Sequence, residues 1–277
     1  MTLLRAARSE LTKQFTTPMW WVLALVLIVY VGSTAGGLAG LFAALSNGTL
    51  AAGGTNAPAI PAEALPPIIY SLATAVGYIF PLLIGTLLVT GEFRHKTLTP
   101  TFLATPRRGI ALAGKVLAGV VMGLVFAAVA LVATVGLGAT VLALMGIDTQ
   151  LSAADTWAML GRIVLAFVLW VLIGIGVGAL VRNQVAAVVG VIAFTQFLEP
   201  ILRTVAGLLE GVAGAARFLP GATSDALVGA SFYSTLTVPG GGGADTLEWW
   251  AGGLVLLAYA LVLIVLGYLV SWRRDVS

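Results

Sequence analysis

The chain has 277 residues, of which 60% are hydrophobic and 9% are charged, and its net charge is +3. A water-soluble domain carries about 25% charged residues, so the composition excludes a soluble protein and predicts one that crosses a lipid bilayer several times. The absence of cysteine excludes disulfides, thiolate metal sites and a cysteine nucleophile. The small positive charge does not indicate nucleic-acid binding, and we expect no nucleic-acid partner, because anionic lipid headgroups attract basic loops equally well.

Residues 1–17 are predicted to form an amphipathic helix in the membrane interface. Leu4, Ala7, Leu11 and Phe15 share one face of such a helix, and polar residues occupy another. Apolar positions three or four residues apart are typical of a helix that lies along a lipid surface. A short solvated extension of the first membrane span is the alternative.

Six apolar stretches are long enough to cross a bilayer, which takes about 20 apolar residues. They run from Met19 to Leu45, Pro67 to Thr90, Ile110 to Met145, Trp157 to Val181, Gln184 to Val205 and Trp249 to Trp272. They predict an all-α polytopic membrane protein with a single membrane domain over residues 1–277. The third stretch is too long for a straight crossing. Either it kinks at Gly119, Gly123, Gly136 or Gly138, or its first turns lie at the membrane interface.

Basic residues predict the orientation, because Lys and Arg near span ends collect on the cytoplasmic side. With both termini in the cytoplasm, eleven of the fourteen Lys and Arg residues lie on that side. They are Arg5, Arg8, Lys13, Arg94, Lys96, Arg107, Arg108, Lys115, Arg182, Arg273 and Arg274. We therefore predict a multi-pass protein of the cell (plasma) membrane with cytoplasmic termini.

The connection over residues 206–248 is predicted to be a short outer helical hairpin between the fifth and sixth spans. Its apolar pieces are too short to cross, and breakers such as Gly211 and Pro220 separate them. At membrane depth such a backbone must be helical or shielded by protein. The hairpin is expected either to enter the outer leaflet or to cap the bundle.

No catalytic or metal site is predicted. His95, the single histidine, stands among basic residues, where nothing resembles a catalytic triad or a metal shell. Residues 109–116 resemble a phosphate-binding loop, but Val116 occupies the Ser or Thr position and the segment opens a span instead of following a strand. Lys115 is interpreted as an anchor that snorkels to the membrane surface. We expect no enzyme activity and no cofactor or metal bound by this chain.

Charged residues within spans are few. Glu199 and Arg203 lie one helical turn apart toward the outer end of the fifth span, where we expect them to pair. No charge is predicted near the middle of the bilayer, where a proton-coupled carrier would need one. Energy is therefore expected to come from outside this chain.

Residues 91–109 form the longest polar and basic stretch and are predicted to be a cytoplasmic loop with a short helix. Thr97 or Thr99 can cap this helix and Pro106 can end it. Its apolar side consists of Leu98, Phe102 and Leu103. Such a side can dock into a groove of another protein or rest on lipid, and the residues alone leave both open.

The run from Glu92 to Lys115 also carries a recognisable motif. It consists of Glu92, Thr97, Leu98, Leu103, Ala104, Thr105, Pro106, Arg108, Gly114 and Lys115. This motif resembles the signature after the second helix of type-2 ABC transporter permeases: an acid, Gly-Thr-Leu, an apolar helix, a Pro-x-Arg turn and a Gly-Lys. Lys96 stands where the family has its glycine. Six spans, an N-terminal helix and an outer hairpin extend the likeness over nearly the whole chain.

The resemblance implies a permease subunit, usually of an exporter, that pairs with an identical or sister permease chain. Two copies of a separate ABC ATPase would bind ATP and magnesium and push on residues 91–109 as a coupling helix. The coupling residues that it implies are Glu92, Arg94, Thr97, Leu98, Thr101, Phe102, Thr105 and Arg108.

Two polar stripes are candidates for the translocation path of such a permease. They comprise Tyr70, Thr74 and Tyr78 in the second span and Gln196, Glu199 and Arg203 in the fifth. Interhelical hydrogen bonding and interface anchoring are the alternative role for these residues. A carrier driven by an ion gradient, and a membrane scaffold for a signalling or immunity complex, remain open as functions.

Overall fold

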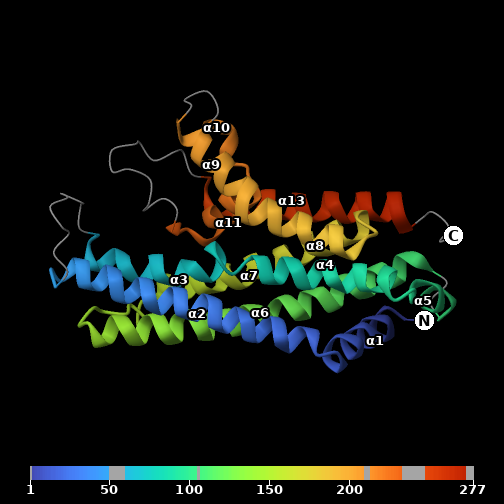
Figure 1. Ribbon diagram of the computed structural model, residues 1–277, viewed down its shortest axis with the longest axis horizontal. Helices are drawn as coiled ribbons and strands as arrows, with labels where there is room; N and C mark the ends of the chain where they lie inside the picture. The colour runs from blue at the N-terminus through green and yellow to red at the C-terminus, as the bar shows by residue number, and fades with distance from the viewer. Residues whose placement is uncertain (1, 50–59, 105–106, 209–212, 233–246, 273–277) are drawn as a thin grey trace.

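The computed structural model describes residues 2–49, 60–104, 107–208, 213–232 and 247–272 (Figure 1). Every regular element in these ranges is a helix. The α-helices are α1 (Leu3–Thr16), α2 (Met19–Ser46), α3 (Leu65–Ala75), α4 (Ile79–Arg94), α5 (Leu98–Ala104), α6 (Arg108–Leu144), α7 (Ala154–Leu180), α8 (Gln184–Ala193), α9 (Glu199–Leu208), α10 (Ala213–Ala216), α11 (Pro220–Val228) and α13 (Trp249–Gly267). A 3-10 turn, η1 (Ala62–Ala64), and two π-helical segments, η2 (Phe194–Leu198) and η3 (Tyr268–Trp272), complete them.

Six helical segments are long and apolar enough to span a membrane, which confirms the predicted all-α polytopic fold. They are Met19–Ser46, Ala62–Arg94, Arg108–Leu144, Ala154–Leu180, Gln184–Ala206 and Trp249–Val270. The predicted stretches differ from them by only a few residues at most ends, because long apolar runs leave little choice of position.

The second and fourth spans form the interior of the bundle, where α4 packs closely on α7. A Cβ atom at Gly85 would collide with the backbone of Val171, and one at Gly174 would collide with that of Leu82. Small residues let helix backbones approach closely in a membrane. Gly85 and Gly174 have this role here, and the second span is the most deeply buried of the six.

The third span, α6, is one continuous helix. Two of the glycines considered as kink sites serve close packing instead: a Cβ atom at Gly123 would lie 2.8 Å from the Cα atom of Val168 on α7, and one at Gly119 would meet Ile175. At 1.5 Å per residue, its 37 residues extend about 55 Å. This length exceeds the thickness of a bilayer core, which is about 30 Å.

The N-terminal helix α1 is separate from the first span. Thr17 has an extended backbone between α1 and α2, as expected for a residue that precedes a proline. Helix α1 packs on α6 with Ala6 and Ala7 buried, and Leu4 stays exposed. The alternative of a helical extension of the first span is therefore wrong.

The second and fifth spans are both interrupted. Residues 76–78 form a turn between α3 and α4, where the ring of Pro81 would crowd the carbonyl group of Gly77 in a continuous helix. In the fifth span, Pro200 has no amide hydrogen to donate to Gln196. The helix adapts by widening into η2, and the amide of Glu199 donates to Phe194.

The connection between the fifth and sixth spans is helical in its described parts. Helix α11 begins at Pro220 and ends at Gly229, whose φ of 80° is the left-handed conformation that glycine favours. It packs against α13, α7 and α3. Figure 1 shows α9 and α10 rising from the side of the bundle, away from the end where α1 and α5 lie. The rest of the predicted hairpin, residues 209–212 and 233–246, lies outside the described ranges.

Candidate functional site

The short helix α5 is attached to the end of the second span by a tight turn. Lys96 has a φ of 54°, the left-handed conformation, and the amide of Thr97 donates to the carbonyl oxygen of Glu92 at 3.0 Å. The hydroxyl group of Thr101 then donates to the carboxylate of Glu92 at 3.2 Å. One side chain of α5 is thereby tied directly to α4.

Glu92 belongs to a set of four charges, which we call the α1–α6 network: Glu10, Glu92 and Lys115, which are buried, and Lys13, which is partly exposed. Lys115 Nζ lies 2.6 Å from Glu10 Oε2 and 3.0 Å from Glu92 Oε2. Lys13 Nζ lies 2.7 Å from Glu10 Oε1 and 3.1 Å from Glu92 Oε1. Two acids and two bases alternate, so the network joins α1, α4 and α6 and leaves no net charge.

The pKa values in α1 show how strongly these charges interact. Burial alone would raise the pKa of the Glu10 carboxyl, but Lys115 and Lys13 outweigh it and hold the pKa below its ordinary value. Burial would likewise lower the pKa of the Lys13 ammonium, but Glu10 and Glu92 raise it above its ordinary value. Both groups are therefore charged in the folded protein at neutral pH.

The position of Lys115 corrects its interpretation as a snorkelling anchor. Its side chain is 0% exposed, because two carboxylates inside the protein replace the headgroups that a snorkelling lysine would reach. Residues 109–116 lie within continuous helix α6 and form no loop.

The predicted coupling residues divide into an inward and an outward group. Glu92 is buried in the network, and Leu98 is buried in the core, so neither is placed to touch a partner directly. Arg94 and Thr97 are exposed. Phe102 is partly buried beneath the guanidinium group of Arg108, 5.1 Å from the ring centre.

Leu103, which the sequence assigned to the apolar side of this helix, is 78% exposed. Thr105, another predicted coupling residue, lies outside the described residues. Of the coupling residues that the motif implied, Glu92 and Leu98 are therefore not on the outward surface.

A second buried charged group, which we call the α9–α11 cluster, consists of Glu199, Arg203 and Asp225. Arg203 Nη2 lies 3.1 Å from Glu199 Oε1, as the sequence predicted, and Arg203 Nη1 lies 2.8 Å from Asp225 Oδ2. The backbone amide of Gly221 also donates to Glu199. Burial raises the pKa of the Asp225 carboxyl, although Arg203 opposes the shift.

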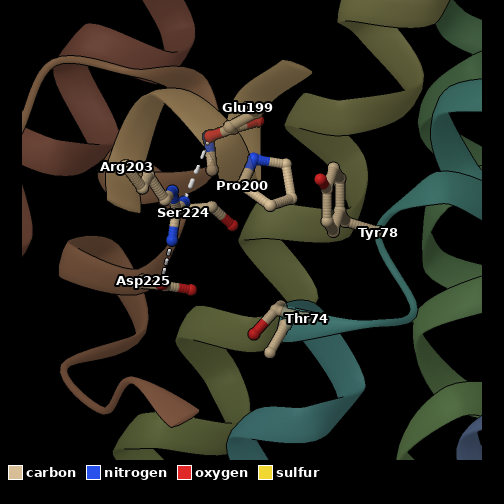
Figure 2. Close-up of a pocket in the computed structure, with 9 residues that line it drawn as sticks. Thr74, Tyr78, Glu199, Pro200, Arg203, Ser224 and Asp225 are labelled. Atoms are coloured by element: carbon tan, nitrogen blue, oxygen red, sulfur yellow. Dashed lines mark hydrogen bonds and ion pairs between the residues drawn. The ribbon is translucent and has the colours of Figure 1, made fainter. Parts of the chain in front are cut away.

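Figure 2 shows that the α9–α11 cluster borders a small pocket between α3, α9 and α11. The residues lining the pocket are Thr74, Ala75, Tyr78, Glu199, Pro200, Arg203, Gly221, Ser224 and Asp225. The pocket lies where both interrupted spans meet, because the Tyr78 hydroxyl in the turn donates to the carbonyl oxygen of Thr195 in η2 at 2.9 Å. Interrupted spans are a frequent setting for binding sites in transporters.

Four of the six predicted path residues come together at this pocket: Thr74, Tyr78, Glu199 and Arg203. The other two do not. The Tyr70 hydroxyl donates to the carbonyl oxygen of Thr149 in the α6–α7 connection, and Gln196 is exposed. The structure thus narrows the two polar stripes to one location, and their role in transport stays a prediction.

Sequence reasoning missed Glu10, Lys13 and Asp225 as partners in these groups. Glu10 lies with Ala6 and Ala7 on the buried side of α1. An acid on the same helix face as two alanines could have indicated that this carboxylate is buried and paired. Asp225 is 22 residues from its partner Arg203, and no periodic pattern links them. Its pairing depends on how α11 folds back against the bundle.

No model of a known protein family matches this chain, and no curated protein matches it. The function must therefore be argued from the two charged groups and from α5.

Proposed function

We propose that this chain is the permease subunit of an ABC exporter, which couples through α5 to a separate ATPase. Contacts between α5 and the helix bundle support a mechanical connection between them. The observation that carries the proposal is the hydrogen bond from Thr101 to Glu92, because Glu92 also contacts Lys13 and Lys115. A push on α5 thus reaches α1, α4 and α6 through buried charges.

The turn before α5 gives further support. Lys96 stands where the resembling family has glycine, and its φ of 54° is a conformation that glycine adopts without the cost paid by other residues. The backbone at Lys96 thus has a conformation that a glycine at this position could also adopt. The exposed Leu103 and Arg94 form the surface that would meet the ATPase.

Affinity purification of the full chain from its native membrane in mild detergent tests the proposal. We expect an ATPase with a phosphate-binding loop in stoichiometric amount. Leu103→Asp should remove it, because the substitution places a charge in an apolar contact. Leu144→Asp is the matched control, since Leu144 is also exposed, at 81%, but lies at the far end of α6.

Two results would contradict the proposal: a folded chain purified without any ATPase, or equal ATPase recovery with Leu103→Asp and with the wild type. Glu92 is a poor site for this test. Reversing its charge would place it against Lys13 and Lys115 and disturb the network and the fold.

A carrier driven by an ion gradient is the second candidate, and the α9–α11 cluster favours it. Buried carboxylates beside a break in a membrane helix are typical of ion and proton paths. Transport in sealed vesicles distinguishes the candidates. Uptake that follows an imposed ion gradient without ATP supports the carrier, and uptake that requires ATP together with the ATPase supports the permease.

A further inference from the structure

The α9–α11 cluster contains an excess of negative charge. Glu199 and Asp225 share one arginine, and each terminal nitrogen of Arg203 is already paired with one of them. Arg162 on α7 also approaches α11, but its guanidinium lies over the Trp249 ring, with no ion pair to the cluster among the described contacts. The formal charge of the three residues is therefore −1. A buried charge needs a partner.

The excess charge is located at one oxygen of Glu199. The residue is 1% exposed, and Oε1 accepts hydrogen bonds from Arg203 and Gly221. Oε2 is buried without a hydrogen-bond partner among the described residues. Figure 2 shows this second oxygen turned away from Arg203. A buried carboxylate oxygen in this state is costly unless a ligand donates to it.

The other walls of the pocket suit a small hydrogen-bond donor. The Thr74 hydroxyl donates to the backbone carbonyl oxygen of Ser71, and the Ser224 hydroxyl accepts from Trp170 Nε1 at 3.1 Å. The oxygen of Thr74 keeps a lone pair with which to accept a bond. The cavity measures about 10 Å³, which is room for about one water molecule. An ammonium group is close to that size, carries one positive charge and has several donors.

We infer that this pocket binds the primary ammonium group of a cationic cargo, with Glu199 Oε2 as its principal acceptor. The inference rests on the proposed transport function and deepens it by assigning the chemistry of the cargo. Arg203 then acts as a positioning residue, because it holds Glu199 Oε1 and Asp225 Oδ2 and so directs the remaining carboxylate oxygen. Tetraalkylammonium ions are too large for the pocket in this conformation.

The test is thermal unfolding of the purified full chain in detergent with methylammonium chloride as the probe, at constant ionic strength. A ligand that binds the folded state raises the unfolding temperature in a saturable way. We expect saturation with methylammonium and a half-saturating concentration at least about tenfold higher for tetramethylammonium, which corresponds to roughly 1.4 kcal/mol. Methanol tests whether the charge is needed and should have no saturable effect.

Variants locate the site. Glu199→Gln keeps the shape of the side chain but removes the excess charge, and we expect it to weaken methylammonium binding by about tenfold or more. Asp225→Asn also makes the cluster neutral and should weaken binding, which provides a second variant if the first does not fold. Glu63→Gln removes an exposed carboxylate and should bind as the wild type does.

Equal effects of methylammonium on the wild type and on Glu199→Gln would overturn the inference. So would a wild type that shows no saturable effect but whose stability depends on pH only when Glu199 is present, because a proton would then be the occupant. These measurements need no ATPase. Failure here beside successful ATPase capture refutes only the cargo assignment, and the reverse result refutes the permease.

Discussion

The two charged groups differ in the balance of their charges. The α1–α6 network contains two acids and two bases in alternation, and every carboxylate oxygen lies near a lysine. The α9–α11 cluster contains two acids and one base, and Glu199 Oε2 has neither an ion pair nor a hydrogen bond among the described residues. A balanced group can hold helices together, whereas an unbalanced one is suited to receiving a ligand.

The largest effect is expected at the centre of the balanced network. Lys115→Met leaves Glu10 and Glu92 buried with only Lys13, and stranding a buried charge costs about 3–5 kcal/mol. Lys13→Met is the matched control, because its side chain is 44% exposed and exposed pairs contribute about 0–1 kcal/mol. Thermal unfolding followed by circular dichroism measures both. Equal losses would show that the two lysines are equivalent.

In the α9–α11 cluster, loss of the base should lower the free energy of unfolding more than loss of an acid. Arg203→Met strands two buried carboxylates and should cost about 3–5 kcal/mol. Glu199→Gln leaves Arg203 paired with Asp225 and should cost no more than about 1–2 kcal/mol. Unfolding of the two purified variants under identical conditions compares them. A greater loss with Glu199→Gln would refute the assigned charge excess.

A smaller effect is expected from separating the helices that hold the balanced network. A Cβ atom at Gly114 would lie 2.9 Å from Ala6 Cβ, so Gly114→Ala should push α1 from α6 and cost about 1–3 kcal/mol. Gly109→Ala on the same helix is the control, because among the described residues its new Cβ would meet only Tyr268 Oη, at 3.8 Å. Unfolding temperatures that fall equally would contradict the close approach of α1.

The smallest expected effect is on the pH dependence of stability, which should have opposite signs for the two groups. The pKa of Glu10 is lowered in the folded protein, which stabilises the fold at pH values above the ordinary pKa of a glutamate. This contribution is lost as the pH falls through the folded-state pKa. The raised pKa of Asp225 has the opposite sign, because the folded state binds the proton more tightly and loses stability as the pH rises through that range.

The stability of the wild type relative to Glu10→Gln should therefore increase as the pH rises. Relative to Asp225→Asn, it should decrease. Unfolding temperatures of the three proteins over a series of acidic to neutral buffers give both slopes, and slopes of the same sign would refute the contrast.

The fold was largely predictable because each span is a local property of the sequence. About 20 apolar residues suffice to indicate a membrane helix, and the pattern of Glu199 and Arg203 one turn apart was enough to predict their ion pair. The interruptions were less evident. Pro81 and Pro200 cause them. A proline within an apolar run indicates that the helix is disturbed there, but it does not indicate how: one span has a turn and the other a π-helical segment.

The charged groups could not be predicted completely, because they depend on contacts between distant helices. In the sequence, Lys115 stands at the end of an apolar run, as a snorkelling lysine would. Only the packing of α1 on α6 brings Glu10, which is 105 residues away, to the ammonium group of Lys115. Asp225 reaches Arg203 only because α11 folds back into the bundle. Such contacts leave no periodic signal in a single sequence.

The uninterrupted course of α6 has a mechanical consequence. Near one end Gly114 lies against Ala6 of α1, and toward the other a Cβ atom at Gly138 would approach Ile69 of α3 to 2.6 Å. A tilt of about 5° around the midpoint of a rod of about 55 Å would displace each tip by roughly 2.4 Å. Helix α6 is thus a lever arm between α1 and α3, and α3 carries Thr74 at the wall of the pocket.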